Sequence, residues 1–124
     1  MANQKDRFSE CAVDFPDLLT RVDNDRELVR ELFDMFKKEF PHLLKSLREY
    51  VRCGDMGGVE TTSHTLKGML ASLSVTRASA AAARLEQIGR LEDRSKLGEA
   101  LTNFEHEATG LLSELDAYLT GAIP

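Results

Sequence analysis

The sequence contains no tryptophan, three prolines and two cysteines among its 124 residues. Valine and isoleucine are scarce beside leucine and alanine, a composition that favours helices over strands. Cys11 and Cys53 do not have the spacing of a C-x-x-C pair, so we expect reduced and partly buried thiols.

Long apolar runs are also missing, and none approaches the roughly 18 residues that a membrane span requires. The first ten residues, MANQKDRFSE, lack the apolar core of a signal peptide. The formal net charge of −5 argues against binding to nucleic acid, which depends on clustered lysine and arginine. We therefore expect a cytoplasmic protein, or a soluble part of a larger one, that contacts neither membranes nor nucleic acid.

What the chain does contain is apolar residues at helical spacing. The overall composition, 42% hydrophobic and 30% charged, is that of an ordinary soluble domain with one core. Apolar positions recur every three or four residues, which predicts amphipathic helices. The three clearest stripes are Val29, Phe33, Phe36, Phe40, Leu43 or Leu44, Leu47 and Val51; Ala78, Ala81, Ala82, Leu85 and Ile88; and Leu97, Leu101, Phe104, Ala108, Leu111, Leu115 and Leu119.

Capping residues set the limits of the first two predicted helices. A short helix should occupy residues 14–21, with an aspartate as its N-cap. A long one should begin at Asn24 and end at Gly54. We expect Pro41 to kink this long helix near Lys37 or to divide it in two, because proline lacks the N–H of a helical hydrogen bond.

Three more helices should follow. The third should cover residues 55–73 with Asp55 as its cap, and the fourth should begin with a cap at Thr76 and end at Gly89. The fifth should begin at Asp93 or Ser95 and run to about residue 119. Short joints between long helices favour antiparallel neighbours.

The predicted fold is therefore all-α, an up-down antiparallel four-helix bundle with a short additional helix at its N-terminus. Residues 1–13 are expected to be a flexible segment, and residues 14–120 a single domain. Each long helix has one apolar stripe, and a closed bundle buries one stripe per helix. No apolar face is then left for a second copy, so we expect a monomer.

The predicted third helix contains the stretch SHTLKGMLASL, with a glycine that costs about 1 kcal/mol relative to alanine inside a helix. At about 100° per residue, Lys67, Gly68 and Ala71 share a face with His64, opposite the apolar side chains. Such a histidine is suited to accept a phosphoryl group: its imidazole is nucleophilic near pH 7, Lys67 neutralises an anion, and Gly68 leaves room for a partner. Spacing alone leaves open a plain solvated histidine.

The segment His64-Thr65-Leu66-Lys67-Gly68, followed by Ala71 and Leu73, resembles the active-site helix of histidine-containing phosphotransfer (HPt) domains. Gly54-Asp55 and Leu85-Glu86 resemble further features of that family, and the similarity covers about residues 14–119. Ser63 and Ser74-Val75 depart from it, since the family has a small alanine before the histidine and often a glycine after the helix.

The resemblance implies a carrier that passes phosphoryl groups between receiver-domain aspartates in a multistep phosphorelay. His64 would be the phosphoacceptor, Lys67 would stabilise charge, and Gly68 would give clearance to the partner. The resemblance further implies that the protein has no autokinase activity. It also implies no cofactor, because the Mg²⁺ used in transfer belongs to the receiver. The partners would be receiver domains, with a hybrid sensor histidine kinase as a further candidate.

Several residues outside the motif have competing interpretations. Lys45 and Arg48 lie on a basic face that is either simply solvated or helps to meet an acidic receiver surface, and we count them with Ala71 as candidate partner-binding residues. His42 and His106 lack partners at metal-ligand spacing, so we expect no metal site. The alternative function is a non-catalytic helical interaction module that binds a receiver or a kinase without carrying phosphate.

Overall fold

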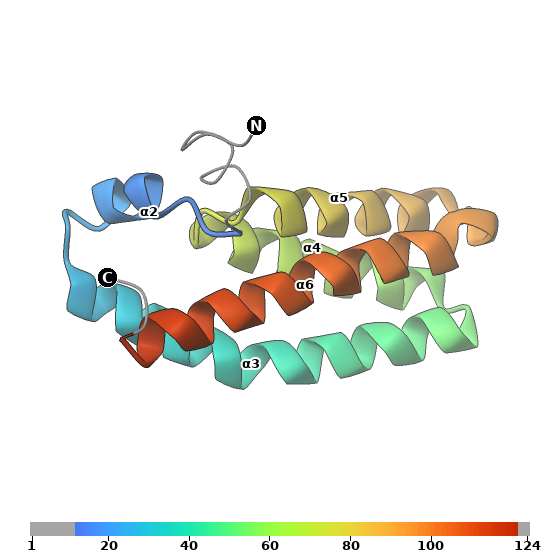
Figure 1. Cartoon of the computed structure of the whole chain (residues 1–124). Helices are drawn as coiled ribbons and strands as arrows, with labels where there is room; N and C mark the ends of the chain where they lie inside the picture. The colour runs from blue at the N-terminus through green and yellow to red at the C-terminus, as the bar shows by residue number, and fades with distance from the viewer. Residues whose placement is uncertain (1–11, 122–124) are drawn as a thin grey trace, which may run out of the picture.

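The computed structural model describes residues 12–121, and the regular elements in this part of the chain are all helices (Figure 1). No strand occurs among these residues. The elements are α2 (Phe15–Arg21), α3 (Arg26–Cys53), α4 (Met56–Ser72), α5 (Thr76–Leu91), the 3₁₀ turn η1 (Arg94–Lys96) and α6 (Leu97–Leu119).

Helices α3 to α6 form the predicted bundle. They run in alternating directions, and α2 lies across one end (Figure 1). Contacts join α3 to α4, α4 to α5, α5 to α6 and α6 back to α3, so the four helices enclose one core. Most residues of the predicted stripes are buried, in agreement with the all-α fold, and side chains outside those stripes complete the core. The largest fully buried side chains are Phe33, Phe40, Phe104, Leu18, Leu47, Leu66, Leu70, Leu85, Leu111 and Leu115.

Helix α2 is held to the bundle by aromatic packing. The ring of Phe15 stacks on that of Tyr118 in α6 at a centroid distance of 5.4 Å, and meets Phe33 of α3 edge-on at 6.1 Å. Asp14 is the N-cap and accepts a hydrogen bond from the Asp17 N–H, as the sequence predicts. A seven-residue helix, too short to be stable alone, therefore has a fixed place.

The residues just before α2 are anchored to the bundle. The Glu114 carboxylate accepts hydrogen bonds from the backbone N–H groups of Ala12 and Val13, at 2.7 and 2.9 Å. Val13 is buried and pairs with Val75 in an isolated β-bridge. Residues 12 and 13 are thus held by the bundle. The expected flexible segment over residues 1–13 otherwise lies outside the described residues and stays a prediction.

The ends of the helices follow their caps closely. Gly54 takes a left-handed conformation (φ 72°) after α3, and Asp55 caps α4 by accepting from the Gly58 N–H, both as predicted. The N-cap of α3 is Asp25 rather than Asn24, and that of α5 is Val75 rather than Thr76. Each of these differences is a single residue.

The expected division of the long helix and the expected helix end at Gly89 are absent, whereas the alternative of a kink near Lys37 stays a prediction. Helix α3 runs through Pro41 undivided, because the Phe40 and Leu47 side chains on either side are buried in the core and hold the backbone helical. Helix α5 continues past Gly89 to Leu91, and its C-cap, Glu92, adopts the left-handed conformation (φ 55°). Gly89 is buried against α4, where a Cβ atom would lie 2.8 Å from the Glu60 nitrogen, so this glycine allows close helix packing.

Cys53, at the C-terminal end of α3, is a free and exposed cysteine. The expectation of a partly buried thiol is therefore wrong at this position. Cys11 lies outside the described residues.

Candidate functional site

Helix α4 turns one face to the core and the histidine to solvent. Val59, Leu66 and Leu70 are fully buried, whereas the His64 side chain is 67% exposed. The orientation that the apolar spacing predicts is therefore correct. An exposed imidazole on a rigid, packed helix can be reached by another macromolecule.

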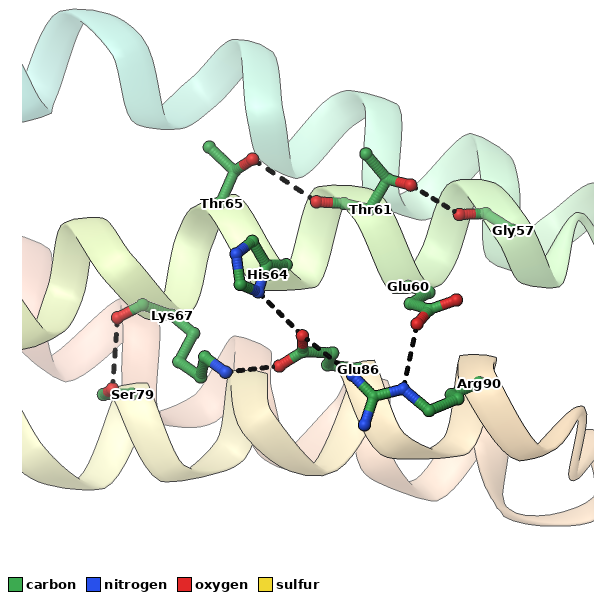
Figure 2. A network of polar contacts seen from close by, with 9 residues as sticks. All are labelled: Gly57, Glu60, Thr61, His64, Thr65, Lys67, Ser79, Glu86 and Arg90. Carbon is green, nitrogen blue, oxygen red and sulfur yellow. Dashed lines mark hydrogen bonds and ion pairs between the residues drawn. The ribbon is translucent and has the colours of Figure 1, made fainter.

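The histidine is bound to a carboxylate from the neighbouring helix. Glu86 of α5 extends toward α4, and its Oε2 lies 2.7 Å from His64 Nδ1 (Figure 2). Its other oxygen, Oε1, accepts a hydrogen bond from Lys67 Nζ at 2.6 Å. One carboxylate therefore links the two residues that the motif places a turn apart.

Glu86 is largely withdrawn from water, with a side chain only 8% exposed. The hydrogen bonds from Lys67 and then His64 lower the pKa of its carboxyl group below the ordinary value, against the opposing effect of burial. Glu86 is therefore ionised near neutral pH and can only accept hydrogen bonds. The proton between it and His64 must accordingly sit on the ring.

This bond selects the tautomer of the imidazole. When the ring is neutral and Nδ1 carries its single proton, Nε2 retains an unshared electron pair. Figure 2 shows Nδ1 facing Glu86 and the second ring nitrogen turned away from the carboxylate. The nucleophilic nitrogen is thus the one that points outward.

A further cation completes the network. Arg90, one turn after Glu86 on α5, lies 3.3 Å from Glu86 Oε2 and donates to Glu60 of α4 at 3.0 Å (Figure 2). Its hydrogen bond to Glu60 raises the pKa of the Arg90 guanidinium. Together these ion pairs join α4 to α5 beside the histidine.

Two small residues continue the face beside His64. Gly68 is exposed, and a Cβ atom placed there would meet no heavy atom within 4 Å. Ala71, one turn further, is also exposed. The fold of this chain therefore does not itself require a glycine at position 68.

The structure does not bring Lys45 and Arg48 to this face. Arg48 forms a bidentate pair with Glu105 of α6, at 3.1 and 3.2 Å, where α3 packs against α6. Lys45 is exposed one turn earlier on the same helix. In the order of the bundle, the contact between α3 and α6 is opposite the contact between α4 and α5. A partner contact by Lys45 or Arg48 remains a prediction, and it would need a second surface.

Ser63, beside the histidine, is completely buried, and its hydroxyl has no hydrogen-bond partner. The sequence places this residue near the edge of the core, whereas the structure places it inside. An unpaired buried hydroxyl costs stability.

In the sequence, Glu86 stands out only through the Leu85-Glu86 resemblance to the family, and nothing there predicts its place in the site. A signal was present, because Glu86 falls on the same face of α5 as buried Ala82 and Gly89. A carboxylate among core positions is rarely left without partners. The identity of those partners depends on the packing of α5 against α4.

Within residues 12–121, no cluster of three or more histidine, cysteine, aspartate or glutamate side chains is arranged to hold a metal ion. In the same part of the chain, no helix has both the length and the apolar character needed to cross a membrane.

Comparison with known proteins assigns the family. No curated protein and no solved structure matched the chain. The family model described as the Hpt domain matches residues 31–122, a span that includes His64, Lys67, Gly68 and Glu86. Domains of this family carry phosphoryl groups on histidine in two-component systems, where they interact with receiver domains and kinases. The chain therefore belongs to the Hpt domain family.

Proposed function

We propose that this protein carries a phosphoryl group on Nε2 of His64, taking it from the aspartate of one receiver domain and passing it to that of another. The observation that supports this most directly is the exposed imidazole with Nδ1 bound to the buried Glu86 carboxylate. That arrangement leaves a nucleophilic nitrogen facing solvent on a rigid helix.

The transfer step needs no group beyond those of the two partners. The Nε2 electron pair attacks the phosphorus of the aspartyl phosphate, a N–P bond forms, and the P–O bond breaks with its electrons returning to the aspartate carboxylate. The Nδ1 proton stays on the ring, which becomes positively charged. Glu86 stabilises that charge at 2.7 Å. The reverse sequence delivers the group to the second receiver.

Lys67 and Gly68 support the same step in different ways. Lys67 can turn from Glu86 toward the incoming phosphoryl oxygens and stabilise their charge. Gly68 and Ala71 keep the face flat, so that a receiver can bring its phosphoaspartate against the ring. We also propose that the protein has no autokinase activity, is located in the cytoplasm and is a monomer.

The alternative is a module that binds a receiver or a kinase without carrying phosphate. Nothing in such a role would need a defined tautomer of His64, so the Glu86 contact favours the carrier. The alternative also predicts that the natural protein never acquires label, and that it binds a receiver equally well when His64 is replaced.

The experiment is to mix the protein with receivers of the source organism that carry ³²P on aspartate. We expect label on this chain that is stable in base and labile in acid, as for phosphohistidine. His64→Gln should abolish it, and His42→Gln and His106→Gln are matched controls, because these are the only other histidines of the chain. Label that persists in the His64→Gln protein would refute the assignment.

A further inference from the structure

In the unphosphorylated protein, Lys67 is already paired. Its Nζ lies 2.6 Å from Glu86 Oε1, while Glu86 Oε2 holds His64 Nδ1 at 2.7 Å. Both contacts use the same carboxylate, whose side chain is 8% exposed, whereas the Lys67 side chain is 36% exposed. The lysine is therefore the more mobile partner, tied to a fixed anion.

Phosphorylation places a second anion within this network. A phosphoryl group carries a charge of about −1.5 to −2 near pH 7. On Nε2, it lies on the side of the ring turned away from Glu86 (Figure 2). One ammonium group cannot make a close ion pair with two anions on different sides of the ring, so the two compete for it.

We infer that Glu86 competes with the phosphoryl group for Lys67 and thereby weakens the stabilisation that the lysine gives to phosphorylated His64. This inference rests on the proposed function and adds a regulator of the phosphorylated state. The carboxylate stabilises the ring cation during attack, and afterwards it keeps the phosphorylated form from becoming too stable to donate. A carrier that must both accept and release the group benefits from such a balance.

A second cation beside this carboxylate, Arg90, is also exposed, with 61% of its side chain accessible to solvent. Arg90 contacts Glu86 Oε2 at 3.3 Å and pairs with Glu60 at 3.0 Å. Glu86→Gln weakens the contact with Arg90 whether or not Lys67 is present, so the effect of Arg90 cancels when the loss of Lys67 is compared between the two Glu86 backgrounds.

The test is a double-mutant cycle of four proteins: the natural sequence, Glu86→Gln, Lys67→Met and the double variant. Each is phosphorylated on His64 with phosphoramidate, a small-molecule phosphoryl donor, so that no receiver is needed. The readout is the second proton-dissociation constant of the phosphoryl group, from the pH dependence of its ³¹P chemical shift. A paired cation favours the dianion and therefore raises this constant.

We expect Lys67→Met to decrease the dissociation constant in both backgrounds, and to do so about threefold more strongly when Glu86 is replaced. The direct effect of the Glu86 charge on the phosphoryl group occurs with and without Lys67, so it cancels in the cycle. Lys38→Met is the matched control, because Lys38 pairs with Asp34 on the surface of α3, and its replacement should leave the constant unchanged.

Equal effects of Lys67→Met in the two backgrounds would overturn the inference, since they would show that Glu86 does not withhold the lysine. The proposed function is tested by a different result, so the two can fail independently. A protein that takes label from phosphoramidate and gives the expected cycle, but never takes label from phosphorylated receivers, would refute the relay while leaving the competition established.

Discussion

Gly68 is the residue where the demands of stability and of function differ most clearly. Glycine inside a helix costs about 0.5–1 kcal/mol relative to alanine. A Cβ atom at position 68 would meet no heavy atom within 4 Å, so nothing in the fold offsets that cost. We therefore expect Gly68→Ala to increase the free energy of unfolding by about 0.5–1 kcal/mol, which corresponds to about 2–4 °C in Tm for a domain of this size.

A larger side chain at position 68 should impair function only in the step where a receiver binds beside His64. Gly68→Gln places a long side chain beside His64, and because misplacement of the reacting groups by about 1 Å can cost 10²-fold in rate, we expect phosphoryl transfer to slow by at least about tenfold. Unfolding is followed by circular dichroism during heating or denaturant titration, and transfer by the appearance of label on this chain.

Gly110 provides the matched control. It lies within α6, and a Cβ atom there also meets no heavy atom within 4 Å. Gly110→Ala should stabilise the protein by a similar amount, and Gly110→Gln should leave transfer unchanged. A loss of stability in Gly68→Ala, or undiminished transfer in Gly68→Gln, would refute the clearance argument.

Three further predictions concern packing and charge. Gly89→Ala should destabilise the protein by about 1–3 kcal/mol in chemical denaturation, because the added Cβ atom would lie 2.8 Å from the Glu60 nitrogen and 2.9 Å from the Met56 carbonyl oxygen; unchanged stability would contradict the packing account. Ser63→Ala should stabilise it by about 1 kcal/mol, because the buried hydroxyl has no partner; destabilisation would show that the hydroxyl is satisfied in solution. The lowered pKa of Glu86 in the folded state means that its ionised form contributes stability above its unfolded pKa of 4.5, and that this contribution is lost as the pH falls through the folded value. On acidification from about pH 5 to pH 3, the free energy of unfolding should therefore decrease less for Glu86→Gln than for the natural protein. Equal decreases would contradict the claim that ionised Glu86 stabilises the folded state.

Much of the fold could be predicted from local patterns because caps and apolar stripes act over a few residues. Asp14, Gly54 and Asp55 mark helix ends in the sequence and in the structure alike. The division expected at Pro41 and the helix end expected at Gly89 do not occur, because the effects of these residues depend on neighbours far along the chain. Core packing keeps α3 helical through Pro41, and the approach of α4 explains Gly89 without a helix end.

The candidate site divides in the same way. The shared face of His64, Lys67 and Gly68 follows from the geometry of one helix, and the structure confirms their orientation. The contact with Glu86 joins residues 22 positions apart and depends on how two helices pack, so the spacing within the motif could not supply it. Glu86 also pairs with Lys67. The motif alone assigns this lysine to an incoming anion and gives no sign of a partner within the chain.

The most direct measurement of the central claim is the site and regiochemistry of phosphorylation. After transfer from a phosphorylated receiver, ³¹P–¹H correlation spectra should show the phosphoryl group on Nε2 of His64, the nitrogen that Glu86 leaves without a proton. A phosphoryl group on Nδ1, on another residue, or on no residue of this chain would contradict the account.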